Sequence, residues 1–219
     1  MQAVLWDMDG TLVDTEPYWI ATEFAMAERY GATWSQAHAM ELVGGELVES
    51  GRYIKRVMGL DLTPEEIVEE LLDGVVAKVD QEVPWRPGAV ELLTGLAEAG
   101  VRCGLVTMSY QRFVAPILAH LPPETFRVVV TGEQVSRGKP HPEPYLTAAA
   151  ALGVVPEECV AIEDSNTGAR SAEEAGCAVL VVENHVEVAA GPRRTFAASL
   201  VDVTVESLAK LSGGHEIHR

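Results

Sequence analysis

The chain has 219 residues, of which 47% are hydrophobic and 22% are charged, so it can bury a substantial core. Its 33 acidic and 16 basic side chains give a formal charge of −17 at pH 7, which disfavours binding to nucleic acid or to an anionic membrane. The length fits one domain, or a core domain with a modest insert.

Short apolar runs that end in polar or glycine-rich turns predict buried strands along the chain. They lie at residues 3–6, 101–106, 128–130, 160–162 and 178–182. Helical patterns alternate with them at residues 89–99, 112–120, 142–152 and 167–175. This alternation predicts right-handed crossovers and a doubly wound, mostly parallel α/β sheet with helices on both faces.

The interval 16–84 breaks the alternation, because it offers helical patterns and no convincing strand. Its helices are expected at residues 17–30, 35–43, 48–58 and 64–79. Thr63, Pro64 and Glu66 form a predicted capping box at the start of the last helix, and residues 83–88 are typical of a return linker. We therefore expect an α/β core of residues 1–15 and 85–212, an inserted helical subdomain of residues 16–84, and a disordered tail at residues 213–219.

The cysteines and the N-terminus bear on the compartment. Cys103, Cys159 and Cys177 are odd in number, lack the spacing of metal ligands and begin apolar runs, so we expect buried free thiols. Residues 1–14 carry carboxylates and no basic side chain, which argues against a signal peptide. No apolar stretch approaches the roughly 18 residues of a membrane span. We expect a cytoplasmic protein.

Two carboxylates, Asp7 and Asp9, follow the first strand directly and precede Gly10. At the carboxyl end of a strand, this spacing aims both side chains at one place. Close carboxylates repel each other unless a cation lies between them or one binds a proton, so the pattern indicates a hard metal or separate acid and base roles. The alternative is a solvated turn that uses Asp and Gly for backbone reasons.

Four motifs in this order resemble those of the haloacid dehalogenase superfamily of phosphohydrolases, over nearly the whole chain. They are the strand followed by Asp-x-Asp-Gly-Thr at residues 7–11, a strand that ends at Thr107, Lys139 in a loop before a helix, and a strand that ends at Glu163 and Asp164. The resemblance implies a Rossmann-like core. It identifies the insert 16–84 with the small helical cap of the β-phosphoglucomutase-like subgroup.

In the mechanism that this resemblance implies, the Asp7 carboxylate attacks phosphorus and forms an aspartyl-phosphate. Asp9 protonates the leaving alkoxide and then deprotonates the attacking water. Mg²⁺ binds Asp7, Asp164 and the main-chain carbonyl of Asp9. Glu163 is expected to reach the metal either directly or through water.

Lys139 and the Thr107 hydroxyl are expected to stabilise charge on the phosphoryl oxygens. Taken singly, Thr107 could be an ordinary strand-end hydroxyl and Lys139 a solvated loop lysine. Their occurrence together with the acidic motifs favours the catalytic interpretation. Asp9 excludes the dehalogenases and phosphonatases of the superfamily, which lack an aspartate at this position.

The β-phosphoglucomutase-like subgroup contains both mutases and phosphatases. The mutase has a histidine in the first cap helix where this chain has Trp19, and its cap lysine and arginine fall near Val43 and Leu47. An indole cannot shuttle a proton, and the two apolar side chains cannot compensate phosphate charge. Water is therefore the expected acceptor. A phosphosugar mutase and a non-catalytic protein that binds a phosphorylated ligand are the alternatives.

The expected partner is a small phosphorylated metabolite, selected by the cap. Arg52 and Arg56, spaced i and i+4, are assigned to an anionic substrate, with a solvated helix face as the alternative. Trp19 is assigned to a substrate wall or to packing, and His141 to a substrate contact or a loop role. Met108 and Ser109, next to Thr107, are also assigned to the substrate. We expect a monomer or a weak homodimer.

Overall fold

The computed structural model describes residues 1–43 and 47–212. The chain divides into two compact units. Met1–Asp14 and the chain from Trp85 onward form one, which we call the core unit, and Thr15–Pro84 form the other, the helical unit. The tail 213–219, expected from the sequence to be disordered, lies outside the described residues.

The core unit is built on a six-stranded sheet in the order β3-β2-β1-β4-β5-β6, in which every neighbouring pair is parallel. The strands are β1 (Ala3–Trp6), β2 (Arg102–Val106), β3 (Val128–Val130), β4 (Cys159–Glu163), β5 (Ala178–Val181) and β6 (Arg194–Phe196). The central strands β1 and β4 are buried along their whole length, which is why they are uninterrupted apolar runs. The predicted doubly wound α/β core is confirmed.

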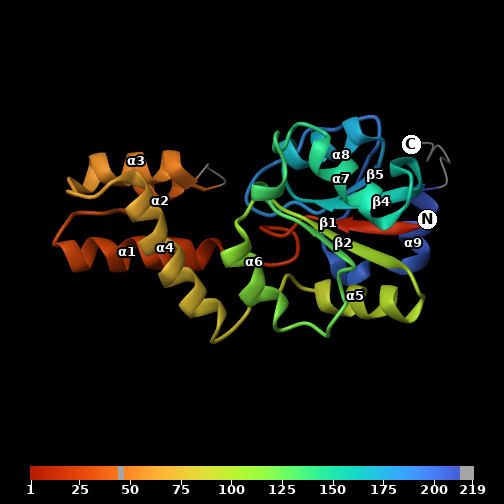
Figure 1. Cartoon of the computed structure of the whole chain (residues 1–219), viewed down its shortest axis with the longest axis horizontal. Coiled ribbons are helices and arrows are strands. Elements are labelled where there is room, and N and C mark those ends of the chain that lie inside the picture. The colour runs from red at the N-terminus through yellow and green to blue at the C-terminus, as the bar shows by residue number, and fades with distance from the viewer. Residues whose placement is uncertain (44–46, 213–219) are drawn as a thin grey trace. The chain divides into compact units, whose positions relative to one another are not determined.

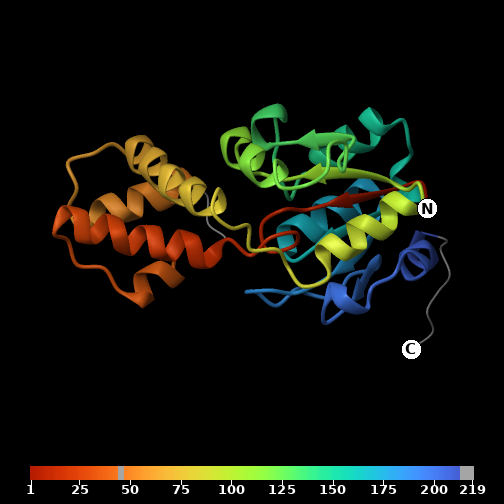
Figure 2. The ribbon, with the colours of Figure 1, turned by 90° about the horizontal axis from the view of Figure 1, so that it is seen from below.

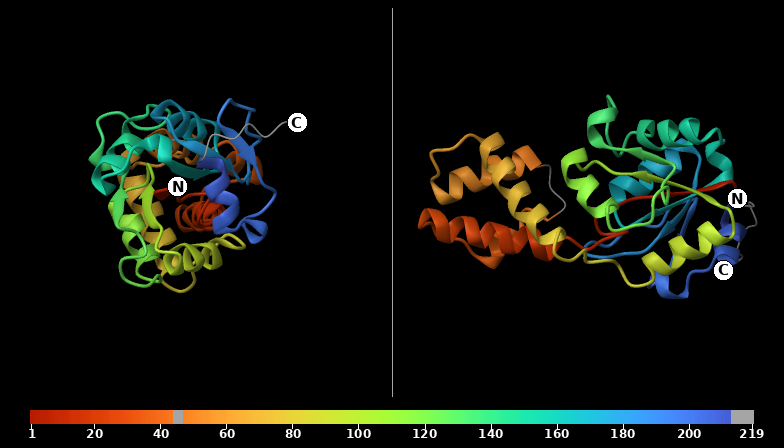
Figure 3. Two further views of the ribbon diagram at one scale, coloured as in Figure 1. Left: turned by 90° about the vertical axis from the view of Figure 1, so that its right-hand side faces the viewer. Right: turned by 60° about the horizontal axis from the view of Figure 1, so that its bottom comes forward.

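Helices cover both faces of this sheet. α5 (Ala89–Glu98) and α9 (Val205–Ser212) pack on one face, and α7 (Glu143–Leu152) and α8 (Asn166–Ala175) pack on the other (Figures 1 and 2). α6 (Gln111–Leu118) follows β2. The right panel of Figure 3 shows the strands fanned between these two layers.

The order of the strands determines where a ligand can bind. The chain passes from β1 to β2 and β3 on one side, and then crosses to β4, β5 and β6 on the other. In a doubly wound sheet, binding sites form at the carboxyl ends of the strands where this reversal occurs. Asp7 directly follows β1, Thr107 follows β2, and Glu163 is the last residue of β4. The topology thus brings three of the motifs to one edge of the sheet.

The helical unit contains α1 (Glu16–Tyr30), α2 (Gln36–Met40), α3 (Leu47–Met58) and α4 (Pro64–Val79). α4 packs against both α1 and α3, around a core that includes Met26, Ile54 and Ile67. The capping box is confirmed, because the Glu66 N–H donates to Thr63 Oγ1 at 3.1 Å and the Thr63 N–H donates to Glu66 Oε2 at 2.7 Å.

The chain passes from the core unit to the helical unit and back through two segments that pair with each other. Val13 forms an antiparallel bridge with Trp85, and the Arg86 N–H donates to the Leu12 carbonyl at 3.0 Å. Both segments belong to the core unit. The two ends of the insert therefore start from adjacent points.

Among the strands and α-helices that the structure describes, β6 and α9 were not predicted, and one helix is shorter than expected. β6 is three residues long and has no buried residue, and α9 is eight residues long and buries only Leu208, so neither shows a long apolar pattern. α2 ends at Met40, whereas a helix over residues 35–43 was expected. All three cysteines are free and buried, as predicted. In the described part of the chain, no helix is long and apolar enough to cross a membrane.

Candidate active site

The turn after β1 places two carboxylates at the edge of the sheet. Asp7 continues the strand, since its N–H donates to the Ile162 carbonyl at 3.0 Å, and its side chain is buried. Gly10 closes the turn with a φ of 87°, a conformation that strains residues with a side chain. A Cβ atom at Gly10 would lie 1.9 Å from Asp164 Oδ2, so the close approach of the acidic residue also requires glycine.

The Asp9 side chain is held by hydroxyl groups that follow β2. Ser109 Oγ donates to Asp9 Oδ2 at 2.6 Å, and Thr107 Oγ1 lies 3.4 Å from the same oxygen. The Ser109 N–H donates in turn to Thr107 Oγ1 at 3.0 Å. Ser109, assigned to the substrate from the sequence, thus contacts Asp9 in this structure.

Lys139 joins the carboxylates of two neighbouring strands. Its Nζ lies 2.6 Å from Asp7 Oδ1 and 2.6 Å from Glu163 Oε1, and its side chain is only 6% exposed. The Lys139 N–H donates to Met108 Sδ at 3.3 Å, so Met108 supports the loop that carries the lysine. The structure therefore brings the third motif into contact with the first and the fourth.

Glu163 and Asp164 end β4 in different surroundings. Glu163 is fully buried, with Oε1 accepting hydrogen bonds from Lys139 Nζ and from the Tyr145 hydroxyl, each at 2.6 Å. Its other oxygen, Oε2, accepts from Ser165 Oγ at 3.1 Å. Asp164 Oδ1 accepts from Thr11 Oγ1 at 3.3 Å.

The buried acids have the donor set that a hard divalent cation requires. One oxygen from each of Asp7, Glu163 and Asp164 lies within 4.8 Å of the others. Asp7 Oδ2 is buried and has no hydrogen-bond partner among the described residues. Three carboxylates beside one ammonium leave two negative charges uncompensated, which Mg²⁺ would neutralise. These observations fit a Mg²⁺ site.

The pKa values of these groups reflect the same excess of negative charge. Burial and the neighbouring Glu163 raise the pKa of Asp7 well above its usual range, and the same two causes raise that of Asp164 to about 7. Burial lowers the pKa of Lys139, but the negative charges of Asp7 and Glu163 together have a larger effect and raise it above its usual value. Burial, followed by Glu163, raises the pKa of Tyr145, so its hydroxyl stays a donor.

Comparison with known proteins identifies the family. The family model described as haloacid dehalogenase-like hydrolase matches residues 4–182, most of the chain. This chain belongs to the haloacid dehalogenase-like hydrolases. The resemblance inferred from the four motifs is confirmed.

Relatives of this hydrolase match along most of its length. Hexitol phosphatase A of Escherichia coli K12 is 31% identical over 95% of this chain and 92% of that protein. A phosphorylated carbohydrates phosphatase of Thermotoga maritima is 32% identical over 80% of this chain and 82% of that protein. The crystal structure of a CbbY mutant from Rhodobacter sphaeroides in complex with xylulose-(1,5)bisphosphate has a TM-score of 0.80 and 26% identity, and the match covers 95% and 99% of the two chains.

Three residues assigned to the substrate lie in the helical unit of the hydrolase. Trp19 is on α1, where it packs against the core of that unit, and Arg52 and Arg56 are on α3. Arg52 pairs with Glu49, and the Arg56 guanidinium lies 5.2 Å from the centre of the Tyr53 ring. Their assignment to the substrate stays a prediction.

His141 has loop contacts in the core unit. Its Nδ1 accepts from the Glu143 N–H at 3.1 Å, and its carbonyl accepts from Ser171 Oγ at 2.6 Å. These contacts anchor the lysine loop to α7 and α8. They support the loop role, and a substrate contact stays a prediction.

Three residues that were assigned no role from the sequence hydrogen-bond to the acids: Thr11, Tyr145 and Ser165. Thr11 and Ser165 had a signal, because each lies beside an acidic motif. Ser165 also caps α8, since its Oγ accepts the Gly168 N–H at 3.0 Å. Tyr145 had no such signal, because its contact with Glu163 depends on how α7 packs against β4.

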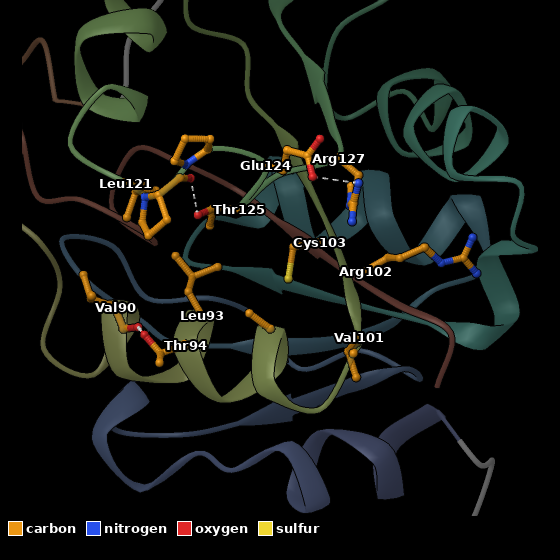
Figure 4. Close-up of a pocket in the computed structure, with 14 residues that line it drawn as sticks. Val90, Leu93, Thr94, Val101, Arg102, Cys103, Leu121, Glu124, Thr125 and Arg127 are labelled. Carbon is orange, nitrogen blue, oxygen red and sulfur yellow. Dashed lines mark hydrogen bonds and ion pairs between the residues drawn. The ribbon is translucent and has the colours of Figure 1, made fainter.

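A separate cavity of about 300 Å³ lies between α5 and the segment before β3. Figure 4 shows Leu93 of α5 and Cys103 of β2 on its walls. Cys103 is near the amino end of β2, whereas the acidic cluster lies at the carboxyl ends of the strands. Burial raises the pKa of the Cys103 thiol to about 12, so it stays protonated and unreactive.

Proposed function

We propose that this hydrolase is a Mg²⁺-dependent phosphatase that cleaves a small sugar or polyol phosphate through an aspartyl-phosphate intermediate. The observation that carries the proposal is the environment of Asp7. One of its oxygens is bound by Lys139, and the other is buried without a hydrogen-bond partner among the described residues. The contact with Lys139 orients the carboxylate, as attack by a nucleophile requires. The buried negative charge is costly to leave without a partner, which favours a cation site beside it.

Lys139 supplies fixed positive charge beside the nucleophile. An ammonium group has three N–H donors, and Asp7 and Glu163 take two of them. Among the described residues no third acceptor contacts Nζ, so the remaining donor is available for a phosphoryl oxygen. Transfer of a phosphoryl group depends mainly on positioning and on stabilising the charge of its oxygens, so this donor and the Thr107 hydroxyl have the chemistry that the reaction needs.

Asp9 is the proposed general acid and base. In the first step it gives a proton to the leaving alkoxide while Asp7 forms a bond to phosphorus. In the second step it takes a proton from water, whose oxygen attacks the aspartyl-phosphate and releases phosphate and free Asp7. The hydroxyl groups of Ser109 and Thr107 lie within hydrogen-bonding distance of Asp9 Oδ2 and hold its carboxyl group in place for both steps.

We propose that Asp7, Asp164 and the main-chain carbonyl of Asp9 would hold Mg²⁺. When bound, the ion supplies positive charge to the acidic cluster and to the phosphoryl oxygens. Both oxygens of Glu163 accept hydrogen bonds from protein groups. We therefore propose that Glu163 is not a direct ligand of the metal. It would compensate the charge of Lys139 and contact the metal through water.

The proposed substrate class rests on the relatives. Two of them are named as phosphatases of hexitols and of phosphorylated carbohydrates, and the CbbY structure holds a sugar bisphosphate. The helical unit, as the proposed cap, would select among such molecules, with Trp19, Arg52 and Arg56 as candidates for the contact. His141 of the core unit is a further candidate. Trp19, Val43 and Leu47 offer no proton shuttle or phosphate ligand, so we propose hydrolysis rather than mutase activity.

The experiment that tests the proposal measures inorganic phosphate released from a panel of sugar, polyol and other metabolite phosphates, with Mg²⁺ and with EDTA. We expect release that needs Mg²⁺ and ranks sugar or polyol phosphates first. Asp7→Asn should lower the rate by at least about 10³-fold, because it removes the nucleophile and leaves the fold intact.

A contaminating phosphatase would act equally in both preparations, so Asp7→Asn is also the control for purity. Unchanged turnover in purified Asp7→Asn would contradict the role of Asp7. Conversion of β-glucose 1-phosphate into glucose 6-phosphate without release of phosphate would show a mutase instead.

A further inference from the structure

A buried tyrosine contacts both Lys139, which binds the proposed nucleophile Asp7, and Glu163, which binds Lys139. Tyr145 comes from α7 and is 0% exposed. Its hydroxyl donates to Glu163 Oε1 at 2.6 Å, the same oxygen that accepts from Lys139 Nζ at 2.6 Å. Its ring centre lies 5.2 Å from Lys139 Nζ, within the range of a cation–π interaction. One side chain thus meets the lysine through its ring and the lysine's counter-ion through its hydroxyl.

The other side of Glu163 is also constrained. Ser165 Oγ donates to Glu163 Oε2 at 3.1 Å. A Cβ atom at Gly168 would lie 1.9 Å from Glu163 Oε1, so the backbone of α8 lies against the carboxylate. Tyr145, Ser165 and Gly168 together restrict the orientation of the Glu163 carboxylate.

The orientation of Glu163 helps to determine the position of the Lys139 ammonium, because a lysine side chain is flexible. A lysine carries its charge on a flexible four-carbon stem, and it forms a precise contact only when its neighbours define one. Here Lys139 Nζ must donate to Asp7 Oδ1 and also direct an N–H toward a phosphoryl oxygen. A misplacement of the order of 1 Å in such a group can cost about a hundredfold in rate.

We propose that Tyr145 is a positioning residue, which holds Glu163 and through it keeps the Lys139 ammonium against Asp7. This inference rests on the proposed phosphatase function for its effect on rate. The contact itself can be tested without any activity.

The variant is Tyr145→Phe, which retains the ring and removes the hydroxyl. With p-nitrophenyl phosphate and Mg²⁺ we expect kcat to fall about tenfold, the worth of one hydrogen bond to a charged group, while KM changes less than about threefold. The matched control is Tyr30→Phe. The Tyr30 hydroxyl donates to Glu70 Oε2 at 2.7 Å in the helical unit, so this change removes the same kind of bond away from the acidic cluster.

The second readout is NMR of the lysine side chains in metal-free protein. The chain has four lysines, so ¹⁵Nζ labelling gives four signals, and Lys139→Met assigns the one of interest. In the wild type, the Lys139 ammonium should exchange slowly with solvent and show nuclear Overhauser effects to the Tyr145 ring. In Tyr145→Phe its exchange should become at least about tenfold faster, and in Tyr30→Phe it should not change.

Three outcomes overturn the inference: a Tyr145→Phe variant with the kcat of the wild type, an unchanged Lys139 signal in that variant, or no contact between Lys139 and the Tyr145 ring in the wild type. The last needs no variant and holds even if Tyr145→Phe folds poorly. Absence of phosphatase activity in the wild type would refute the proposed function, whereas the NMR readout would still decide the position of Lys139.

Discussion

The buried acids depend on two glycines for the space that they occupy. Gly10 faces Asp164 and Gly168 faces Glu163, and at both positions a Cβ atom would lie 1.9 Å from a carboxylate oxygen. Such an overlap can be relieved only by moving the acid or the backbone, and cores that are overpacked lose about 1–3 kcal/mol. The two glycines are therefore part of the acidic site, although they carry no functional group.

Gly168→Ala tests this relation. We expect it to lower the free energy of unfolding by about 1–3 kcal/mol and to lower turnover, because Glu163 must move away from Lys139. The matched control is Gly95→Ala in α5, where the nearest atom to a new Cβ is a Val205 methyl at 3.7 Å. Alanine there should stabilise the protein by up to about 1 kcal/mol. Equal urea midpoints for the wild type and Gly168→Ala would contradict the prediction.

Glu23 is a further buried acid, in the helical unit and outside the acidic cluster. It is 4% exposed, and its Oε2 accepts from the Trp34 indole N–H at 3.2 Å. Burial raises its pKa to about 7, against the smaller opposite effect of Trp34. A raised pKa means that the folded state prefers the protonated form. The stability from this preference is present below about pH 4.5 and is lost as the pH rises through about 7.

Glu23→Gln should remove this pH dependence, because glutamine keeps an acceptor for Trp34 and carries no charge. At pH 8 we expect the variant to be more stable than the wild type by on the order of 1–3 kcal/mol, and at pH 5 we expect little difference. Urea unfolding at both pH values measures this. A difference between the two proteins that is the same at pH 5 and pH 8 would rule out Glu23 as the source.

The helix α4 begins with a complete capping box. The Thr63 side chain and the Glu66 side chain each accept a backbone N–H that the helix cannot satisfy. Thr63→Ala should lower the free energy of unfolding by about 1 kcal/mol. Thr94→Ala is the control, since Thr94 lies within α5 and its hydroxyl bonds to the Val90 carbonyl of the same helix. Alanine there should be neutral or slightly stabilising, and equal losses in the two variants would argue against the cap.

The central strands could be predicted from the sequence because their burial is complete. β1 and β4 are buried on both faces, so the period of the sheet does not interrupt their apolar runs. β6 is three residues long, ends in the exposed Phe196 and forms the edge of the sheet. Its pairing with β5 is made by backbone groups, which leave no mark in the sequence.

In the whole molecule, the excess charge of the acidic cluster couples metal binding to pH. In metal-free protein, the raised pKa values of Asp7 and Asp164 mean that these acids favour folding most when protonated, below about pH 4. This contribution is lost as the pH rises, for Asp164 through about 7. A bound divalent cation reverses the dependence, because it binds the ionised carboxylates and competes with protons.

We therefore expect Mg²⁺ to raise the melting temperature more at pH 8 than at pH 5, relative to EDTA. The magnitude should follow the concentration of Mg²⁺, as for any ligand that binds only the folded state. Asp164→Asn is the control, since it removes a proposed ligand and should abolish most of the rise. A Mg²⁺ effect that is the same at both pH values would contradict the coupling between the acids and the metal.

The acidic site could be predicted from the sequence to the extent that strand ends define it. Parallel strands bring their carboxyl ends to one edge, so the residues after β1, β2 and β4 were expected at the same edge. They are neighbours because β1 lies between β2 and β4 in the sheet. The contact between Tyr145 and Glu163 could not be predicted this way. It depends on the rotation of α7 about its axis, and Tyr145 differs in no local pattern from a tyrosine that only fills the core.

The antiparallel bridge between Val13 and Trp85 has an evolutionary consequence. The insert begins and ends at adjacent residues of the core unit, as a loop does at the two strands of a hairpin. Loops of this kind tolerate insertion, because the inserted residues do not change the pairing of the two segments that flank the loop. If the helical unit selects the substrate as proposed, lineages can exchange or lengthen it while β1 and β4 keep their carboxylates in place. Selectivity and reaction chemistry are then inherited as separate traits of one chain.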